Sequence, residues 1–272
     1  TFCQKKVNEW FGIHSKYTVI KNYTSSVLKF AIRMDLLKSN PMDKVTLPRR
    51  MAEVGKEDGL KYFDKMELQR FFEGSKEYAE QTNNLLYHTL FRLLAFSGMR
   101  KGEALALTWK DLDFTNETVT INKTLTRGLE SRLIIQTPKT AAGKRAIALD
   151  PITLSMLSTW RKQQAMDFLK LGFNTMSGEQ LIFPNTKNEL MVPTKPDKVL
   201  DKIIKRNDLK RITVHGFRHT HCSLLFEAGA SIKEVQDRLG HSDIKVTMNI
   251  YAHVTEKAKE KTAEKFAKYV NF

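Results

Sequence analysis

Cysteine is scarce in this sequence of 272 residues. Cys3 and Cys222 are its two cysteines, and they lie far apart in the chain. The sequence therefore offers neither a disulfide scaffold nor a cysteine-based zinc site. A chain with so little cysteine fits the reducing cytoplasm, and we expect the protein to be located there.

Long apolar runs are lacking as well. No stretch reaches the length needed to span a membrane, and the pattern of a signal peptide does not open the chain. Neither an internal repeat nor a low-complexity tract is present. The first residue is Thr1 rather than methionine, and a helical pattern is already under way there. We therefore expect a part of a longer protein that has no membrane partner.

Positive charge, by contrast, is abundant. The chain has 45 lysine and arginine residues against 30 acidic ones, which gives a formal net charge of +15. This balance predicts a polyanionic partner, and nucleic acid is favoured over an anionic membrane because no amphipathic anchor dominates. A basic protein that is merely soluble is the alternative. Hydrophobic residues make up 41% of the chain, which at this length indicates a large core and two domains.

Residues 214–253 concentrate side chains that can carry chemistry. His215 and Arg218 stand three positions apart, which on a helix places them on one face. Two such donors suit an anion better than a metal, because arginine stays charged and does not ligate metals. His241 follows in a turn, and Tyr251 lies on a further helical segment. Tyrosine is an uncommon nucleophile, but phosphoryl transfer suits it where cations surround the phosphate.

These residues also have structural interpretations. A zinc site built from His215, His219, His221 and Cys222 is disfavoured, because His221 points away from the other two histidines and no second ligand cluster exists. We therefore expect no metal. His215 could instead cap a helix. Tyr251 could be a core aromatic, although its buried hydroxyl would then need a partner.

The order of the motifs, H-x-x-R at 215–218, L-G-H-S at 239–242 and then Tyr251, resembles the tyrosine recombinases of the phage-integrase family. The resemblance implies a mainly α fold with a small antiparallel β-sheet (α+β), made of the family's catalytic domain and part of its helical core-binding domain. It implies a site-specific DNA recombinase, an integrase of a phage or mobile element in a bacterial host. Such an enzyme cleaves and rejoins DNA through a 3′-phosphotyrosyl intermediate and a Holliday junction, without metal, cofactor or ATP.

Two other functions stay open for a chain with these motifs. One is a type IB topoisomerase-like enzyme, which takes the same covalent step without strand exchange. The other is a catalytically silent DNA-binding or regulatory protein of the same fold. Reactive residue types at all the expected positions argue against the silent protein. Two features favour the recombinase over the topoisomerase: the sequence around Tyr251, and the N-terminal residues that are similar to the end of the core-binding domain.

Upstream of these motifs, Arg100 lies between one helix that ends at residues 97–98 and a short helix that follows. It stands beside a strongly apolar run, and a buried arginine needs an anionic partner. Arg100 could simply pair with Glu103 or Asp111 and hold the turn. Residues 97–103 match the family's first catalytic arginine with its acidic companion, so the resemblance implies a catalytic Arg100 that Glu103 supports.

Residues 118–122, 131–137 and 144–149 have strand patterns. The second and third are expected to form a hairpin that holds Lys139 near its tip. The resemblance implies that this hairpin delivers a catalytic lysine to DNA. Lys139 is favoured because the sequence Thr-Pro-Lys-Thr is similar to that of the family, while Lys144 in the same loop remains a rival. Lys144 and Arg145 are also candidate DNA contacts.

The resemblance assigns a role to each side chain. Tyr251 attacks phosphorus, Lys139 protonates the leaving 5′-oxygen, and His215 accepts or helps to transfer the phenolic proton. The remaining donors, which hold the non-bridging oxygens, are Arg100, Arg218 and His241.

Three parts of the chain are expected in this order. Residues 1–48 form helices, of which the second ends at Asn40-Pro41, and are similar to the end of the core-binding domain. Residues 49–60 form a linker in which Arg49 and Arg50 could cross a phosphate backbone. Residues 61–272 form the catalytic domain, with a last helix over 255–270 that starts at Thr255. The resemblance implies double-stranded DNA attachment sites as partners, a homotetramer built through this C-terminal segment, and accessory DNA-bending or directionality factors.

Overall fold

The computed structural model describes residues 2–49, 61–138 and 140–258. The chain divides into two compact units, one up to residue 58 and one from residue 59 onward. Apart from Arg49, the expected linker of residues 49–60 lies outside the described residues. No helix in the described ranges is both long and apolar enough to cross a membrane.

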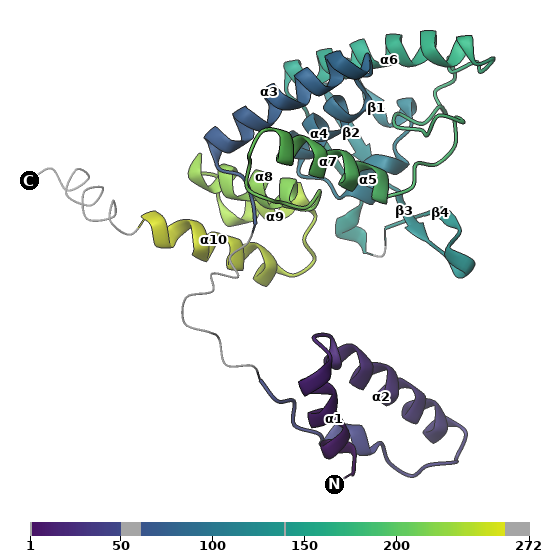
Figure 1. Cartoon of the computed structure of the whole chain (residues 1–272), viewed down its shortest axis with the longest axis vertical. Helices are drawn as coiled ribbons and strands as arrows, with labels where there is room; N and C mark the ends of the chain where they lie inside the picture. The colour runs from purple at the N-terminus through teal and green to yellow at the C-terminus, as the bar shows by residue number, and fades with distance from the viewer. Residues whose placement is uncertain (1, 50–60, 139, 259–272) are drawn as a thin grey trace, which may run out of the picture. The chain divides into compact units, whose positions relative to one another are not determined.

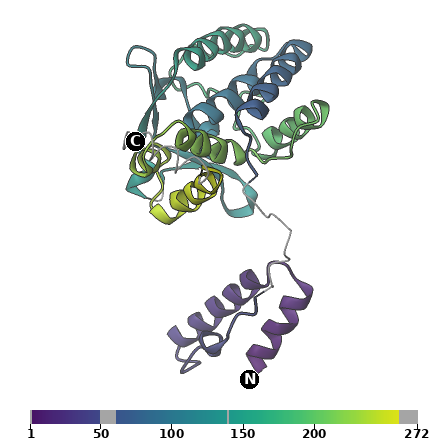
Figure 2. The ribbon, with the colours of Figure 1, turned by 90° about the vertical axis from the view of Figure 1, so that its left-hand side faces the viewer.

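Within residues 2–49, the first unit contains two helices and one short 3-10 turn. Helix α1 (Phe2–Ile13) and helix α2 (Tyr17–Arg33) lie side by side, and η1 (Pro41–Lys44) packs against both (Figure 2). The sequence predicts that the second helix continues to Asn40, and this prediction is wrong. The helix ends at Arg33 because Asp35 adopts a positive φ of 54°. Asn40 instead caps η1, since its side chain accepts a hydrogen bond from the Met42 amide at 3.0 Å.

The second unit is mostly helical, as the sequence predicts (Figure 1). Asp64 and Glu67 form a capping box at the start of a long helix. Asp150 accepts a hydrogen bond from the Thr153 amide, and Pro151 opens a second long helix. The helices of this unit are α3 (Lys65–Thr82), α4 (Leu86–Ser97), α5 (Lys101–Ala106), α6 (Pro151–Lys170), α7 (Thr194–Arg206), α8 (Gly216–Glu227), α9 (Ile232–Leu239) and α10 (Ile244–Ala258).

The strands form two small antiparallel sheets. The first has the order β1 (Leu112–Asp113), β2 (Thr118–Ile121) and β5 (Arg145–Ala148), and the second pairs β3 (Thr124–Arg127) with β4 (Leu133–Gln136). The expected hairpin between residues 131–137 and 144–149 is therefore wrong. β4 takes β3 as its partner, a strand that the sequence interpretation missed, and β5 pairs with β2. Residues 137–144 connect one sheet to the other.

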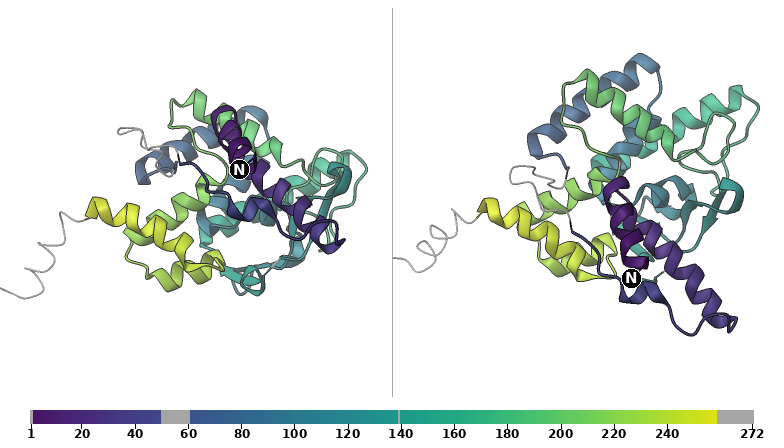
Figure 3. Two further views of the ribbon diagram at one scale, coloured as in Figure 1. Left: turned by 90° about the horizontal axis from the view of Figure 1, so that it is seen from below. Right: turned by 60° about the horizontal axis from the view of Figure 1, so that its bottom comes forward.

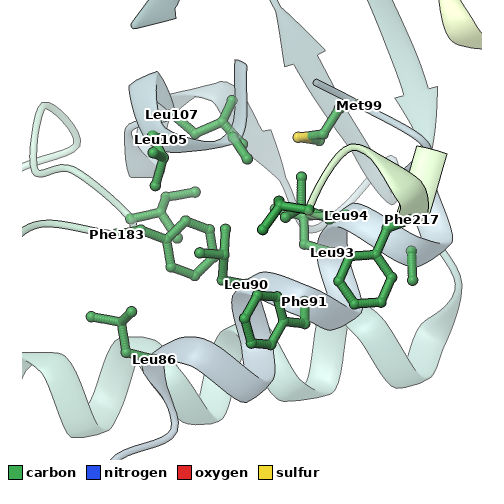
Figure 4. Packing of buried hydrophobic residues seen from close by; sticks show 14 of the residues in the cluster. Leu86, Leu90, Phe91, Leu93, Leu94, Met99, Leu105, Leu107, Phe183 and Phe217 are labelled. Carbon is green, nitrogen blue, oxygen red and sulfur yellow. The ribbon is translucent and has the colours of Figure 1, made fainter. Parts of the chain in front are cut away.

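The core of this unit surrounds α4, whose side chains are buried on nearly every side. Phe217, the residue before Arg218, is completely buried. Its ring lies 5.5 Å from that of Phe91, measured between centroids (Figure 4). The centroid of the Phe71 ring lies 5.1 Å away. Aromatic pairs at these distances contribute beyond the area that they bury. This packing fixes the first turn of α8 against α4.

The last three helices, α8, α9 and α10, pack against one another (Figure 3). A small second core of Cys222, Phe226, Val235, Leu239 and Ile250 joins them. A helix that starts at Thr255 is contradicted, because α10 is already helical from Ile244 and continues through Thr255 to Ala258. No proline or glycine interrupts this stretch, so nothing in it ends one helix and begins another. Residues 259–270 of the expected helix lie outside the described part.

The packing of Phe217 predicts a large loss of stability on truncation. The substitution Phe217→Ala should lower the free energy of unfolding by about 3–5 kcal/mol, because it leaves a cavity among Phe63, Phe71 and Phe91. Urea unfolding followed by circular dichroism measures this change. Leu129 is 92% exposed, so Leu129→Ala serves as the control and should change stability by less than about 0.5 kcal/mol. Equal effects of the two substitutions would contradict the packing described here.

Candidate active site

Arg218 lies in the first turn of α8 and is only 2% exposed. Its guanidinium donates two hydrogen bonds, from Nη1 to the carbonyl oxygen of Gly98 and from Nη2 to that of Leu239, both at 2.8 Å. Gly98 follows the last residue of α4, and Leu239 is the last residue of α9. The two acceptors therefore belong to helix C-termini, where the partial charge is negative and favours a cation.

Glycine is required at the two helix ends that meet here. Gly98 has a φ of +67°, and a Cβ atom at this position would lie 2.5 Å from Leu239 and 2.6 Å from His221. Gly240 has a φ of +68°, and a Cβ atom there would lie 2.5 Å from the carbonyl oxygen of Ala142. Both the backbone conformation and the close approach exclude other residues. The Ser-Gly and Leu-Gly-His motifs thus bring α4 and α9 together around Arg218.

Arg100 caps α5 at the junction that the sequence predicts, but its side chain is 43% exposed rather than deeply buried. Its Nη1 donates to Oε1 of Glu103 at 2.9 Å, and its main-chain amide donates to Oε2 at 2.8 Å. Its other nitrogen, Nη2, lies 3.5 Å from the carbonyl oxygen of Gly240. The pairing with Glu103 that the structural interpretation proposed is present. Asp111 instead pairs with Lys123 at 2.6 Å.

Arg145 is the second cation on Glu103. Its Nη2 and Nη1 donate to the two carboxylate oxygens at 3.0 and 3.3 Å, and both side chains are nearly buried. Burial alone would raise the pKa of Glu103, but the hydrogen bonds from Arg145 and Arg100 and the charge of Arg145 lower it. Arg145 also donates to the carbonyl oxygens of Arg238 and Gly143. Its guanidinium is thus used inside the protein, which does not fit the DNA contact that the sequence suggests.

Two histidines complete the cluster of donors. His241 is 9% exposed, and its Nδ1 lies 2.8 Å from the hydroxyl of Thr247. Burial, followed by the charges of Arg218 and Arg100, lowers the pKa of His241 to about 3. Desolvation and the neighbouring charges of His219 and Arg218 lower the pKa of His215, which is more exposed, to about 4. Both rings are neutral at neutral pH.

The four predicted donors Arg100, Arg218, His215 and His241 thus share one electrostatic neighbourhood. Burial and then the charge of Arg100 lower the pKa of Arg218 to about 9, so the guanidinium stays charged at neutral pH. Arg100, Glu103 and Gly240 line a pocket of about 330 Å³. Of the four donors, Arg100 lines this cavity, and an anion is the ligand that a site with this concentration of positive charge favours.

Tyr251 lies on α10 and is 38% exposed. Its ring packs edge-on against Phe226, with 5.0 Å between the centroids. Phe226 follows Arg218 by about two helical turns, which is about 12 Å along α8. The phenol therefore packs against α8 well away from the level of Arg218.

The remaining predicted site residues are exposed or fall outside the described residues. Lys139 and Arg50 fall outside the described residues. Lys144 and Arg49 are exposed. Thr247 contacts His241 but was missed by sequence reasoning, because a lone threonine within an apolar helical pattern carries no signal of its own.

Comparison with known proteins identifies the family. The model of the phage integrase family matches residues 61–258. This chain belongs to the phage integrase family. The match covers the whole described part of the second unit, from which all the clustered donors come.

Curated relatives of this family member include integrases of mobile elements. The chain is 29% identical over 244 residues to the ICEBs1 integrase of Bacillus subtilis (strain 168), covering 89% of this chain and 62% of that protein. It is also 29% identical over 293 residues to the integrase of Staphylococcus phage L54a, covering 99% of this chain and 79% of that protein. The chain thus spans less than two thirds of the length of the ICEBs1 integrase.

Solved structures confirm the fold that the sequence predicts. The Tn1549 transposon integrase in complex with circular intermediate DNA superposes with a TM-score of 0.74 at 22% identity, covering 97% of this chain and 86% of that chain. The XerH site-specific recombinase bound to palindromic difH substrate gives a TM-score of 0.64 at 21% identity, covering 98% and 72%. The mainly α fold with small antiparallel sheets is therefore that of tyrosine recombinases.

The position of Arg145 predicts a structural effect rather than a DNA-binding one. Arg145→Ala should lower the free energy of unfolding by about 3 kcal/mol, because Glu103 would stay buried without its best-enclosed partner. Urea unfolding measures the change. Lys144→Ala, at the neighbouring exposed position, should leave stability within about 0.5 kcal/mol of the wild type. A stable Arg145→Ala protein with a weaker salt dependence of DNA binding would instead indicate a phosphate contact.

The lowered pKa of His241 predicts a pH dependence of stability. As the pH falls below about 6.5, the unfolded chain takes up a proton at His241 that the folded protein does not bind until about pH 3. Stability at this residue is therefore complete above pH 6.5 and is lost progressively below it. We expect His241→Asn to reduce the loss of unfolding free energy between pH 7 and pH 4.5 by about 2 kcal/mol. Parallel stability curves for the two proteins would show that His241 is not the titrating group.

Proposed function

We propose that this protein is a site-specific DNA recombinase, an integrase of a phage or mobile element. The observation that supports this most is the buried guanidinium of Arg218, which is held by two main-chain carbonyls beside Arg100. Among its described contacts, neither of these hydrogen bonds goes to a carboxylate, so its positive charge remains available to an anion. A DNA phosphate is the anion that the net charge of +15 also favours.

The proposed chemistry is an attack by Tyr251 on a DNA phosphorus. The attack forms a 3′-phosphotyrosyl bond and releases a 5′-hydroxyl, and the bond energy kept in this link allows rejoining. Arg100 and Arg218 would hold the non-bridging oxygens, because a planar guanidinium matches the geometry of a phosphate. This stabilises the charge that develops in the transition state. A Holliday junction would follow when two duplexes exchange strands.

Histidine and lysine would move the protons. If the Thr247 hydroxyl donates to Nδ1 of His241, the ring carries its hydrogen on Nε2 and can donate to a phosphate oxygen. His215, whose ring is neutral, can accept the phenolic proton or assist its transfer. Lys139 is proposed to protonate the leaving 5′-oxygen, with Lys144 as its rival. Glu103 would hold Arg100 rather than react, as its contacts with Arg100 support.

We also propose where the protein acts and what it assembles with. The protein would act on double-stranded attachment sites in the cytoplasm of a bacterial host. Residues 1–48 would be the end of a core-binding domain, with Arg49 and Arg50 near the DNA backbone. The sequence stripe of Ala258, Thr262 and Phe266 supports an exchange of C-terminal segments in a homotetramer, and accessory DNA-bending or directionality factors would direct the outcome.

Two solved complexes support DNA as the partner: the Tn1549 integrase is in complex with circular intermediate DNA, and the XerH recombinase is bound to palindromic difH substrate. A type IB topoisomerase-like enzyme would make the same covalent link without joining two duplexes. Relaxation of supercoiled DNA with no recombination between two duplexes would favour that alternative.

The decisive test uses a nicked suicide substrate, in which cleavage traps the protein on DNA. The wild-type chain should form an adduct that survives denaturing electrophoresis, and Tyr251→Phe should form none, because the nucleophilic oxygen is lost. Tyr78→Phe, on α3, is the matched control and should form as much adduct as the wild type. DNA binding without an adduct in the wild-type chain would support a catalytically silent binding protein.

A further inference from the structure

A histidine–arginine hydrogen bond joins α8 to α9 in the second unit. His221 stands one turn after Arg218 on α8 and is 8% exposed. Arg238 is in the last turn of α9. Nε of Arg238 donates to Nε2 of His221 at 3.0 Å, and Nδ1 of His221 lies 2.8 Å from the carbonyl oxygen of Ala95. Neither residue has a part in the chemistry proposed above.

The contacts of His221 determine its tautomer. The carbonyl oxygen of Ala95 only accepts hydrogen bonds, so Nδ1 must carry the hydrogen. The guanidinium of Arg238 only donates, so Nε2 must offer its lone pair. Burial and then the charge of Arg238 lower the pKa of His221 to about 4. At neutral pH the ring is therefore a neutral bridge between α4 and Arg238.

Arg238 connects three elements. Its Nη2 donates to the carbonyl oxygen of Phe96 at 3.0 Å, on α4, and to that of Ala148 at 3.1 Å, on β5. Its own carbonyl oxygen accepts a hydrogen bond from Nε of Arg145 at 2.9 Å. One side chain and its main chain thus tie the C-terminal ends of α4 and α9 to the strand that carries Arg145.

The same two helix ends hold Arg218. Gly98, which accepts from Nη1 of Arg218, comes two residues after Phe96. Leu239, which accepts from Nη2, comes directly after Arg238. The separation of these two carbonyl oxygens therefore depends on the bridge that Arg238 makes from α9 to α4.

We propose that His221 and Arg238 are positioning residues for the reaction, which act through Arg218. They set the spacing of its two carbonyl acceptors and thereby the direction of its guanidinium toward the phosphate. The inference rests on the proposed recombinase function, since it concerns the same arginine. Neither residue touches the DNA in this proposal.

The first test separates cleavage from DNA binding. Arg238→Lys should slow single-turnover adduct formation on the nicked substrate about ten-fold or more, because small misplacements of a catalytic group have large effects on rate. A lysine carries a single terminal nitrogen and cannot serve His221 and both carbonyls together. The dissociation constant for the same DNA should stay within about two-fold of the wild-type value, because the phosphate contacts that dominate DNA affinity are unchanged. An unchanged rate would overturn the proposal.

Substitutions of His221 test whether its Nε2, which accepts the hydrogen bond from Arg238, matters for the reaction. His221→Phe removes both ring nitrogens and should slow adduct formation, whereas His221→Gln keeps an oxygen that can accept from Arg238 and should recover part of the rate. The glutamine variant retains a polar side chain, so it should fold even if the phenylalanine variant does not. In that case its rate relative to the wild type provides the test. Equal losses in two folded variants would show that the acceptor does not matter.

Matched controls exist elsewhere in the same unit. Arg206 lies in the last turn of α7 and donates to Gln81, and His88 is a partly buried histidine that contacts the hydroxyl of Ser75 at 3.0 Å. Arg206→Lys and His88→Gln should leave the rate of adduct formation unchanged. A similar slowing in these controls would show that the effect at Arg238 and His221 comes from a general loss of stability, and this would overturn the proposal.

A double-mutant cycle shows whether the pair acts through Arg218. In an Arg218→Lys background, Arg238→Lys should cost little further rate, because the group that it positions is already gone. Losses that multiply would overturn the inference while leaving the recombinase intact. If the wild-type chain forms no adduct, the proposed function fails and the inference fails with it. An active wild-type chain whose rate is unchanged by Arg238→Lys would instead overturn the inference alone.

Discussion

The site depends on one buried cation held by the ends of two helices. Arg218 needs the carbonyl of Gly98 and the carbonyl of Leu239, and both are available only because glycine residues let α4 and α9 approach. Main-chain acceptors satisfy the hydrogen bonds of a guanidinium without cancelling its charge, which a carboxylate would do. The fold thus keeps a desolvated positive charge near Arg100, where a phosphate meets little competition from water.

Arg100 and Arg218 have different surroundings. Arg100 is partly exposed and shares Glu103 with Arg145, so part of its charge is balanced inside the protein. Arg218 is buried and has carbonyl partners among its described contacts. Such an asymmetry suits a site in which one donor is fixed before substrate arrives, while the other can adjust its exposed end to the phosphate.

Much of this arrangement could be predicted from sequence, for physical reasons. The helix junction at Arg100 follows from an apolar helix that ends in Ser-Gly, and the capping box at Asp64 is a local pattern. The pairing of β3 with β4 could not be predicted, because strand partners depend on contacts between segments and the short strand at Thr124–Arg127 has little signal. The use of Arg145 inside the protein was also hidden, since a basic residue in a basic loop looks the same whether it faces solvent or Glu103. The contacts of Thr247 and Arg238 could not be predicted for the same reason, because the sequence does not show which internal partner a polar side chain will meet.

Helix α10 has a consequence for how the nucleophile can travel. Thr247 contacts His241, and Tyr251 lies one turn later on the same helix. Because a helix is stiff over a single turn, the backbone at Tyr251 cannot shift toward the arginines while Thr247 stays in place unless the helix unwinds between them. Otherwise a shift of the backbone at Tyr251 also moves Thr247, which contacts the imidazole. The position of the Tyr251 oxygen, which would attack, and that of the His241 ring, which would hold the phosphate, are therefore coupled through a single turn of α10.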